Sequence, residues 1–545
     1  MFSNRFLRGA AFLLVATFTA CGDDDGGGPT VLPAPTNLTA TAISASTIRI
    51  SWAAVTGAQS YFVQRAPTGG AFSTLSSGIT ATQYDDASAV VGTAYNYRVA
   101  AVAGADTSAF SSSATGALGL VTINADITTN RTLDKDTVYV LNGYVKVTNN
   151  ATLTIEAGTR ILGDTVAGSS LWILRGSKIV ANGTAAEPIV FTSRRAVGNR
   201  APGDWGGIII IGNGIINRSG VVNTEGPSTE AENYGGGSDN ADSSGVLRYV
   251  RIEFAGYDVS GGGGSELNGL SMYAVGSKTV LEYVQVLAGL DDSFEWWGGA
   301  VDGRYLVSYE SGDDHFDWSE GFVGRVQHAI AFQTARLTPT GGTGQLSTDP
   351  QGFEADGCQG GGCDNGFRSV PYSDPIFTNF TMVGSGAVET QAAGGFGAVI
   401  RRGTKGLLHN GVIARWKGTG ISVRDSVTGN HLVNDSLNLT DIVFAQNTGG
   451  HYDPDAGTNF GKAAVFTADN HRTATNAADI ITSLTPASLN WTPIGTAATG
   501  CGTIALPAGR TANFFGGILG NPAYCGAVDP AGPQWYQGWT VHATN

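Results

Sequence analysis

Two stretches of the chain repeat one pattern. The first is Tyr283-Val-Gln-Val-Leu-Ala-Gly-Leu-Asp-Asp-Ser-Phe-Glu-Trp-Trp297, and the second is Tyr305-Leu-Val-Ser-Tyr-Glu-Ser-Gly-Asp-Asp-His-Phe-Asp-Trp318. They align without a gap at a spacing of 22 residues (305 − 283). A fixed period in the low twenties, with alternating apolar residues and no helical pattern, is typical of a stacked β-solenoid.

The same pattern of short apolar runs and turns extends from about residue 121 to the end of the chain. Apolar runs of three to five residues, such as 144–147, 151–155 and 207–212, are separated by Gly, Asn and Asp turns. The spacing of 22 residues continues from Tyr305 to Gln327. Three short strands per turn at this period predict a right-handed parallel β-helix over 121–545, closed by a C-terminal cap.

Residues 33–117 have a different pattern, with about seven short alternating segments that predict a β-sandwich. Pro35-Thr-Asn-Leu38, Trp52 and Tyr95-Asn-Tyr97-Arg-Val99 resemble the motifs of a fibronectin type III module. The resemblance implies that Trp52 fills the core between the sheets. The predicted fold class is therefore all-β, a sandwich followed by a β-helix.

The later region resembles pectin-lyase-like proteins and a family of bacterial surface β-helix lipoproteins. The matching stretches are 143–147, 151–159, 176–193, 203–208 (Gly-Asp-Trp-Gly-Gly-Ile) and 397–403 (Gly-Ala-Val-Ile-Arg-Arg-Gly). This resemblance implies a fold and a location, and it supplies no activity.

The first residues have the features of a targeting segment. Arg5 and Arg8 precede a short apolar run, Ala10 to Phe18, which ends in small residues at Cys21. Residues 1–21 resemble a bacterial lipoprotein signal peptide with Cys21 as the lipidated residue; the alternative is an ordinary signal peptide. Residues 22–32 are an acidic, Gly-rich linker. The expected location is the bacterial outer membrane or cell surface.

The composition of the chain bears on its binding partners and on its cysteine pairing. Only 14% of the 545 residues are charged and the formal net charge is −14, which argues against nucleic acid. Beyond Cys21 the cysteines are Cys358, Cys363, Cys501 and Cys525. In an oxidising compartment an even number predicts disulfides, and proximity favours Cys358–Cys363 and Cys501–Cys525. Metal binding is a weaker alternative, because no His lies at ligand spacing.

The repeat brings like charges together. Neighbouring coils lie about 4.8 Å apart, so Asp291 falls beside Asp313, Asp292 beside Asp314, and Glu295 beside Asp317. Carboxylates this close repel, and either a proton or a cation relieves the repulsion. On a straight strand Phe294 and Phe316 point inward, while the acids and His315 form an exposed stripe.

Three interpretations of this stripe remain open. The first is a calcium site formed by Asp291, Glu295, Asp313 and Asp317. The second is catalysis by Asp291, Asp313, Asp314 and Asp317, because pectin-lyase-like glycosidases place paired carboxylates on adjacent coils. The third is that the acids cap turns by accepting backbone N–H bonds.

Trp296, Trp297 and Trp318 are candidates for stacking on sugar rings, with packing inside the fold as the alternative. We therefore expect a lipid-anchored surface protein that binds extracellular glycan, matrix or a surface protein without catalysis. A polysaccharide lyase or glycoside hydrolase and a structural envelope protein are the alternatives.

The lipid anchor gives the first prediction. Replacing Cys21 by Ala removes the thiol that would carry the lipid, so Cys21→Ala expressed in a bacterial host should move from the detergent phase to the aqueous phase in a phase-partition experiment. Cys358→Ala is the control and should partition as the parent does. Unchanged partitioning of Cys21→Ala would exclude the anchor.

Overall fold

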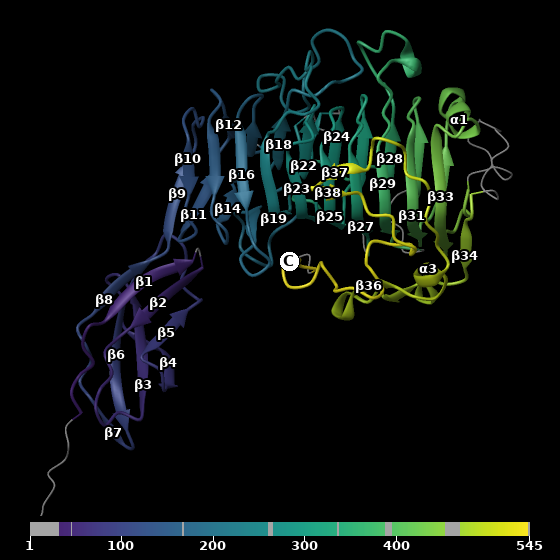
Figure 1. Ribbon diagram of the computed structural model, residues 1–545. Helices are drawn as coiled ribbons and strands as arrows, with labels where there is room; N and C mark the ends of the chain where they lie inside the picture. The colour runs from purple at the N-terminus through teal and green to yellow at the C-terminus, as the bar shows by residue number, and fades with distance from the viewer. Residues whose placement is uncertain are drawn as a thin grey trace, which may run out of the picture. The chain divides into compact units, whose positions relative to one another are not determined.

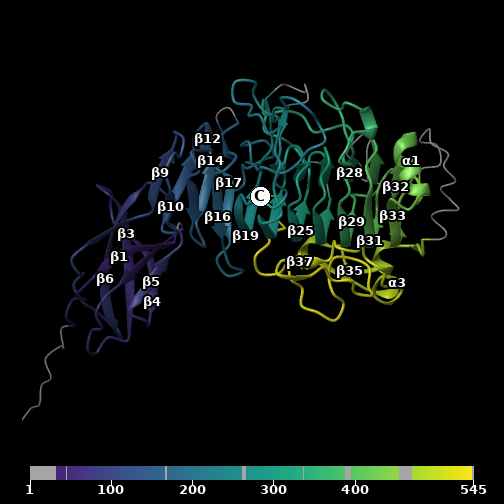
Figure 2. The same cartoon turned by 45° about the horizontal axis from the view of Figure 1, so that its top comes forward.

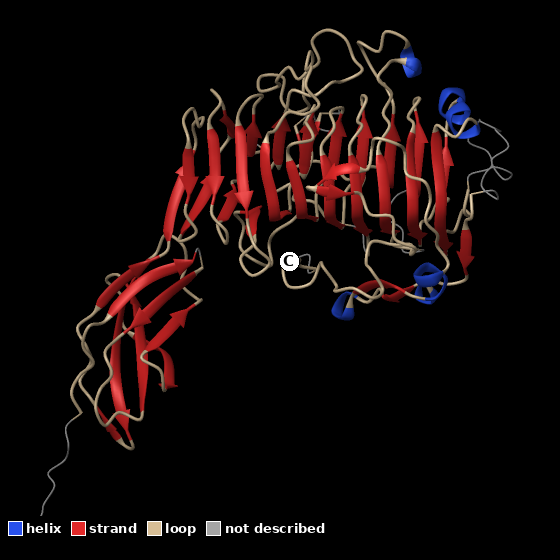
Figure 3. Ribbon diagram, viewed as in Figure 1, coloured by secondary structure: helices blue, strands red, loops and turns tan. Residues whose placement is uncertain are grey.

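The computed structural model describes residues 32–44, 46–165, 168–259, 265–334, 337–386, 395–452 and 469–542. Cys21, the signal segment and nearly all of the linker lie outside these residues. The described chain is almost entirely β-structure, with a few short helices in the loops (Figure 3). Among the described residues, no helix has the length and apolar character needed to cross a membrane.

The N-terminal part is a β-sandwich of two small sheets, as predicted from its alternating segments. One sheet has the order β1-β2-β5 and the other contains β3, β4, β6, β7 and β8. Their bounds are β1 Thr39–Ser44, β2 Thr47–Ser51, β3 Ser60–Pro67, β4 Ser73–Ile79, β5 Gln83–Asp86, β6 Ala94–Ala103, β7 Asp106–Thr107 and β8 Ala114–Ala117. Trp52 is buried with its ring 5.3 Å from that of Tyr61, so it occupies the core as its position predicted.

The rest of the chain forms a parallel β-helix built on two long sheets (Figures 1 and 2). Sheet 1 has 15 strands and sheet 2 has nine, and successive coils pair in parallel throughout both. The strands of sheet 1 are β9 Gly119–Ile123, β10 Arg131–Leu133, β11 Thr137–Leu141, β13 Thr152–Ile155, β14 Arg160–Gly163, β16 Lys178–Asn182, β17 Ile189–Ser193, β19 Gly245–Glu253, β23 Val280–Leu287, β25 Asp302–Tyr309, β27 Arg325–Phe332, β29 Ile376–Val383, β31 Gly406–Ala414, β33 Leu437–Ala445 and β34 Arg472–Ala474. Those of sheet 2 are β12 Tyr144–Val147, β15 Ser170–Ile173, β18 Ile208–Ile211, β22 Leu270–Tyr273, β24 Phe294–Trp297, β26 Phe316–Ser319, β28 Gln351–Asp356, β30 Phe396–Arg401 and β32 Ile421–Val423.

The remaining elements are short. They are β20 Tyr257–Asp258, β21 Glu266–Leu267, the 3₁₀ turn Gly366–Arg368, α1 Ser426–Val433, the 3₁₀ turn Ala477–Asp479, β35 Ile481–Ser483, the 3₁₀ turn Pro486–Ser488, β36 Asn490–Pro493, α3 Gly495–Thr499, β37 Ala512–Phe514 and β38 Gly517–Ile518.

Each long strand of sheet 1 bends at one residue, which turns the strand from one face of the β-helix to the next. These residues stack coil upon coil and all have left-handed backbone angles, with φ between 48° and 62°: Tyr249, Tyr283, Tyr305, His328, Asn379, Asn410 and Asp441. Asn and Asp tolerate this conformation best. The aromatic members stack face to face, with ring centroids 4.4 to 4.9 Å apart, and this contact offsets part of the backbone cost.

The register confirms most of the sequence alignment and corrects one pair. Phe294 pairs with Phe316 and Glu295 with Asp317, as the spacing of 22 residues predicted. Tyr305, however, lies beside His328 and not beside Gln327, which pairs with Arg304. This coil is one residue longer than its predecessor, so the regular period ends there.

The core follows the alternation of the strands. Phe294, Trp296, Phe316 and Trp318 all point into the β-helix and have no exposed surface. Burial of such aromatic columns adds to the stability that the aliphatic core residues supply.

The C-terminal segment runs back along the outside of sheet 1 (yellow in Figure 1). Trp539 packs edge-on against Tyr249 and Tyr283, and Gln285 donates to the carbonyl of Val541 at 2.6 Å. The Cys501–Cys525 disulfide lies at the start of this segment, and a second disulfide joins Cys358 to Cys363, so both predicted pairings are present.

Candidate functional site

A cavity of about 350 Å³ lies on the outer face of sheet 2. Its walls are unusually rich in charge for a recess of this size. The lining residues are Arg218, Asn223, Glu225, Tyr234, Tyr273, Glu295, Trp297, Asp317, Ser319, Glu320, Glu354, Asp356, Gln359, Gly360, Arg401 and Arg402. We call this recess the acidic pocket.

The floor of the acidic pocket is set by strand register. Residues that alternate with the inward aromatic side chains point outward, and parallel pairing stacks them in columns. One column runs Ser271, Glu295, Asp317 and Glu354, through β22, β24, β26 and β28. The neighbouring column begins Tyr273, Trp297 and Ser319, and the rings of Tyr273 and Trp297 stack 4.0 Å apart.

Glu295 and Asp317 form the centre of the floor. Both side chains are 8% exposed. Burial raises the pKa of Glu295 well above its usual value, and the neighbouring Glu225 and Asp317 carboxylates raise it further. Burial also raises the pKa of Asp317, to about 6, although its interactions with Glu295, Arg401 and Arg402 oppose that rise.

Glu225 adds a third carboxyl group from above. It comes from the long segment between β18 and β19, and burial together with nearby Asp and Glu side chains raises its pKa well above the usual value. Asn268 hydrogen-bonds to both carboxyl groups: its Nδ2 donates to Glu295 Oε2 at 2.6 Å and to Glu225 Oε2 at 3.4 Å. The Glu225 backbone N–H donates to the hydroxyl of Tyr273 at 3.1 Å.

The arginines of the pocket are each held by a carboxylate. Arg218 Nη1 lies 2.5 Å from Glu320 Oε1, and the Tyr234 hydroxyl donates to Glu320 Oε2 at 2.6 Å.

At the opposite wall Arg401 donates from Nε to Asp356 Oδ1 at 2.9 Å and also pairs with Glu354, while Arg402 pairs with the second oxygen of Asp356. These pairs fix the walls and balance part of the negative charge.

Two loops from distant parts of the chain join at the rim. Ser219 donates its backbone N–H to the carbonyl of Gly362 at 2.8 Å, and Arg218 Nε donates to the carbonyl of Gly361 at 2.7 Å. Gly361 and Gly362 lie inside the loop closed by the Cys358–Cys363 disulfide. The disulfide thus shapes the rim that carries Gln359 and Gly360.

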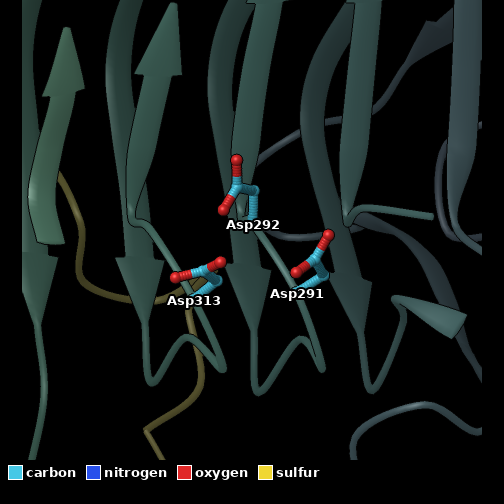
Figure 4. Close-up of side chains that lie close together, drawn as sticks. All are labelled: Asp291, Asp292 and Asp313. Carbon is cyan, nitrogen blue, oxygen red and sulfur yellow. The ribbon is translucent and has the colours of Figure 1, made fainter. Parts of the chain in front are cut away.

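A second group of acids lies at the turns that lead into β24 and β26. Asp291, Asp292 and Asp313 point toward one another there, with carboxylate oxygens within 4.8 Å (Figure 4). Asp292, Asp314 and Asp317 form an overlapping group by the same measure. Among the described residues neither group includes Glu295, so the predicted set of Asp291, Glu295, Asp313 and Asp317 does not form one ligand cluster.

Asp292 and Asp314 also cap turns, as the third interpretation proposed. Each coil offers a side-chain oxygen to the backbone N–H of the next. Asn268 Oδ1 accepts from Asp292 N at 3.2 Å, and Asp292 Oδ1 accepts from Asp314 N at 2.8 Å. Asp314 Oδ1 then accepts from Gln351 N, and Gln351 Oε1 from Phe396 N at 3.0 Å. The turns are tight: a Cβ on Gly312 would lie 1.8 Å from the carbonyl oxygen of Leu290.

The acids do not form the exposed stripe that straight strands predicted. Asp291 and Asp313 are partly exposed, but Asp292, Asp314, Glu295 and Asp317 are buried. His315 is also buried, with Nδ1 2.6 Å from Ser308 Oγ, and burial lowers its pKa to about 3. The turn before each strand breaks the alternation, so His315 points inward while Asp317 points outward.

The prediction of sugar stacking is wrong for two of the three tryptophans. Trp296 and Trp318 have no exposed surface and belong to the core. Trp297 points the other way and lines the acidic pocket, although it is only 7% exposed.

The sequence did not reveal Arg218, Glu225 or Tyr234. They belong to an inserted segment outside the repeat, so no spacing relates them to the floor. Arg401 and Arg402 lay within a quoted motif, Gly397–Gly403, but their pairing with Glu354 and Asp356 depends on a register that crosses 45 residues.

The hydrogen bonds by which each turn caps the next coil give a second prediction. Asp314→Ala leaves the buried N–H of Gln351 without an acceptor and should reduce the free energy of unfolding by about 1–3 kcal/mol. Asp314→Asn keeps a carbonyl acceptor, as Asn268 already does in an earlier coil, and should lose much less. Chemical denaturation followed by tryptophan fluorescence measures both, and equal losses would contradict the capping role.

Comparisons with known proteins agree with this architecture. Residues 125–492 match the family described as pectate-lyase like beta helix domain, and residues 33–116 match the fibronectin type III domain. No curated protein matches the chain. Among solved structures, an Fn3-like protein from Clostridium thermocellum is 38% identical over 15% of this chain and 91% of its own, with a TM-score of 0.15.

Two pectate lyases are also similar in part. Pel3 from Pectobacterium carotovorum is 12% identical over 60% of this chain and 86% of its own, with a TM-score of 0.13. PelI from Erwinia chrysanthemi, solved with tetragalacturonic acid, is 10% identical over 70% and 82%, with a TM-score of 0.12. At such scores the family match alone identifies the fold. The chain belongs to the family of pectate-lyase-like β-helix domain proteins, and it carries a fibronectin type III domain before the β-helix.

Proposed function

We propose that the protein binds an extracellular polysaccharide in the acidic pocket. The observation that carries this proposal is the pocket itself, a recess of about 350 Å³ whose floor combines carboxyl groups with the stacked rings of Tyr273 and Trp297. Carboxyl and amide groups bind sugar hydroxyls, and aromatic rings bind the apolar faces of sugars.

Glycoside hydrolysis is the second candidate, and one specific observation favours it. Glu295 and Asp317 lie on adjacent strands, and burial raises both pKa values, that of Asp317 to about 6. Hydrolysis of a glycosidic bond needs one carboxyl group that donates a proton and one that acts as a base or nucleophile. In this scheme Glu295 would protonate the leaving oxygen, and Asp317 would be the ionised partner.

The third prediction separates binding from hydrolysis. The protein comprising residues 22–545 should be tested by affinity electrophoresis against a panel of soluble polysaccharides. At least one polysaccharide in the gel should slow its migration. If the pair is catalytic, the same polysaccharide should also yield new reducing ends, and Glu295→Gln should abolish them without abolishing binding. Binding without reducing ends supports a non-catalytic role.

The control for this experiment is Asp136→Asn, an exposed acid outside the pocket. It should behave as the parent does in both assays. A protein that no polysaccharide slows, or one that Glu295→Gln and Asp317→Asn leave equally able to bind and cleave, would contradict a function at this pocket.

Calcium is proposed at the turn cluster of Asp291, Asp292 and Asp313, apart from the pocket. The donors fit a hard cation, because three carboxylates present oxygens within 4.8 Å of one another. Burial raises the pKa of all three, and the neighbouring carboxylates raise it further, so a bound cation would favour their ionised forms.

The fourth prediction tests this cation. Calcium should raise the melting temperature of the β-helix, since a ligand that binds only the folded state stabilises it by mass action. Asp313→Asn should melt higher than the parent in chelator, because one repelling charge is gone, and should gain less from calcium.

The matched control is Asp106→Asn in the sandwich, which should leave the calcium response unchanged. No shift in the parent, together with no metal by elemental analysis, would leave turn capping as the whole explanation of these acids.

The location is proposed to be the outer membrane or cell surface, with the lipid on Cys21. Support comes from the sequence of residues 1–32. A surface position would give the acidic pocket access to extracellular polysaccharide.

A further inference from the structure

The acidic pocket has an uneven charge balance. Six carboxyl groups and three guanidinium groups line it. Each guanidinium is already engaged: Arg218 by Glu320, Arg401 by Glu354 and Asp356, and Arg402 by Asp356. An incoming anion would therefore compete with these acids for the guanidinium donors.

Three carboxyl groups are left over. Glu225, Glu295 and Asp317 have no Arg, Lys or His within ion-pair distance in the part of the chain that the structure describes. Asn268 donates to the first two, but an amide offers no charge. The nearest cations to Asp317 are Arg401 and Arg402, which are held by other acids.

Two buried polar atoms at the pocket floor have no partner among the described residues. They are Asp317 Oδ1 and Ser319 Oγ, on side chains only 8% and 9% exposed. Burying a carboxylate oxygen without a donor costs free energy, and a native protein retains such an atom where a ligand supplies the donor. Both residues line the acidic pocket.

The chemistry of that ligand follows from the charges. A uronic acid polymer would bring a further carboxylate to a site whose cations are all paired, and the added repulsion opposes binding. An uncharged sugar would supply hydroxyl donors but no positive charge to the three acids. An ammonium group supplies three donors and a positive charge, and charge-assisted hydrogen bonds are about twice as strong as neutral ones.

We infer that the acidic pocket selects a polysaccharide of amino sugars whose amines are free, with the ammonium held by Glu225, Glu295 and Asp317. This inference rests on the proposed function, because it names the substrate class for the same pocket. Trp297, which lines the pocket and stacks on Tyr273, would contact the neutral part of the sugar.

The test compares three oligosaccharides of equal length by isothermal titration calorimetry, with chelator present. They are an oligomer of glucosamine, the same oligomer fully N-acetylated, and an oligomer of galacturonic acid. The glucosamine oligomer should bind about tenfold more tightly than the acetylated one, the ratio that one charge-assisted hydrogen bond supplies. Its affinity should fall as salt rises, and the galacturonate should not bind.

Two variants localise the effect. Asp317→Asn removes one of the three acids, and Glu295→Gln removes another and serves if the first does not fold. Each should reduce the preference for the free amine while leaving weak binding of the acetylated oligomer. Asp136→Asn, an exposed acid outside the pocket, should leave the preference unchanged.

The outcomes separate the two proposals. Equal binding of the free and acetylated oligomers, or stronger binding of galacturonate with or without calcium, would overturn the charge preference while the proposed glycan binding stands. No binding of any oligosaccharide in the wider panel would overturn both. A preference that survives in Asp317→Asn and Glu295→Gln would place the ammonium elsewhere and contradict the inference.

Discussion

Parallel stacking of coils at about 4.8 Å is the constraint on which the rest of this structure depends. It places equivalent side chains of successive coils in contact, whatever their chemistry. Stacking stabilises apolar residues, because their side chains pack against one another, as in the columns of Phe294 with Phe316 and Trp296 with Trp318. Stacking does not stabilise acidic residues, because Glu295 and Asp317 are brought together by the same register. The fold therefore concentrates like charges wherever a repeat carries an acid.

The repulsion between stacked acids is handled differently at the turns and on the outer face of sheet 2. At the turns, Asp292 and Asp314 each accept a backbone N–H from the next coil, which turns a repeated acid into a repeated hydrogen bond. On the outer face of sheet 2, Asp317 Oδ1 has no donor among the described residues, and burial raises the pKa of Asp317 to about 6. The first arrangement supports the fold, and the second leaves a buried acid at the floor of the pocket.

Sequence reasoning recovered the features that depend on local periodicity. The β-helix, the pairing of residues 294–296 with 316–318 and both disulfides follow from spacing alone. It failed where one residue changes the count: the coil that ends at His328 is longer by one, so Gln327 was aligned with the wrong neighbour. It also failed at the turns, because a strand that begins after a sharp bend does not inherit the inward and outward order of the residues before it. His315 was assigned to the wrong side for that reason.

The acidic pocket shows why repeats alone do not define a specific site. Its floor, Glu295, Asp317 and Glu354, comes from the repeat and is fixed by strand hydrogen bonds. Part of its wall comes from insertions, with Glu225 and Arg218 on one side and the disulfide-closed loop at the rim. A repeat can only present similar residues at even intervals, whereas an insertion can place any side chain over them. In this β-helix the periodic part supplies a rigid row of carboxyl groups and the Arg401 that pairs with Glu354, and the inserted segments place further side chains over that row.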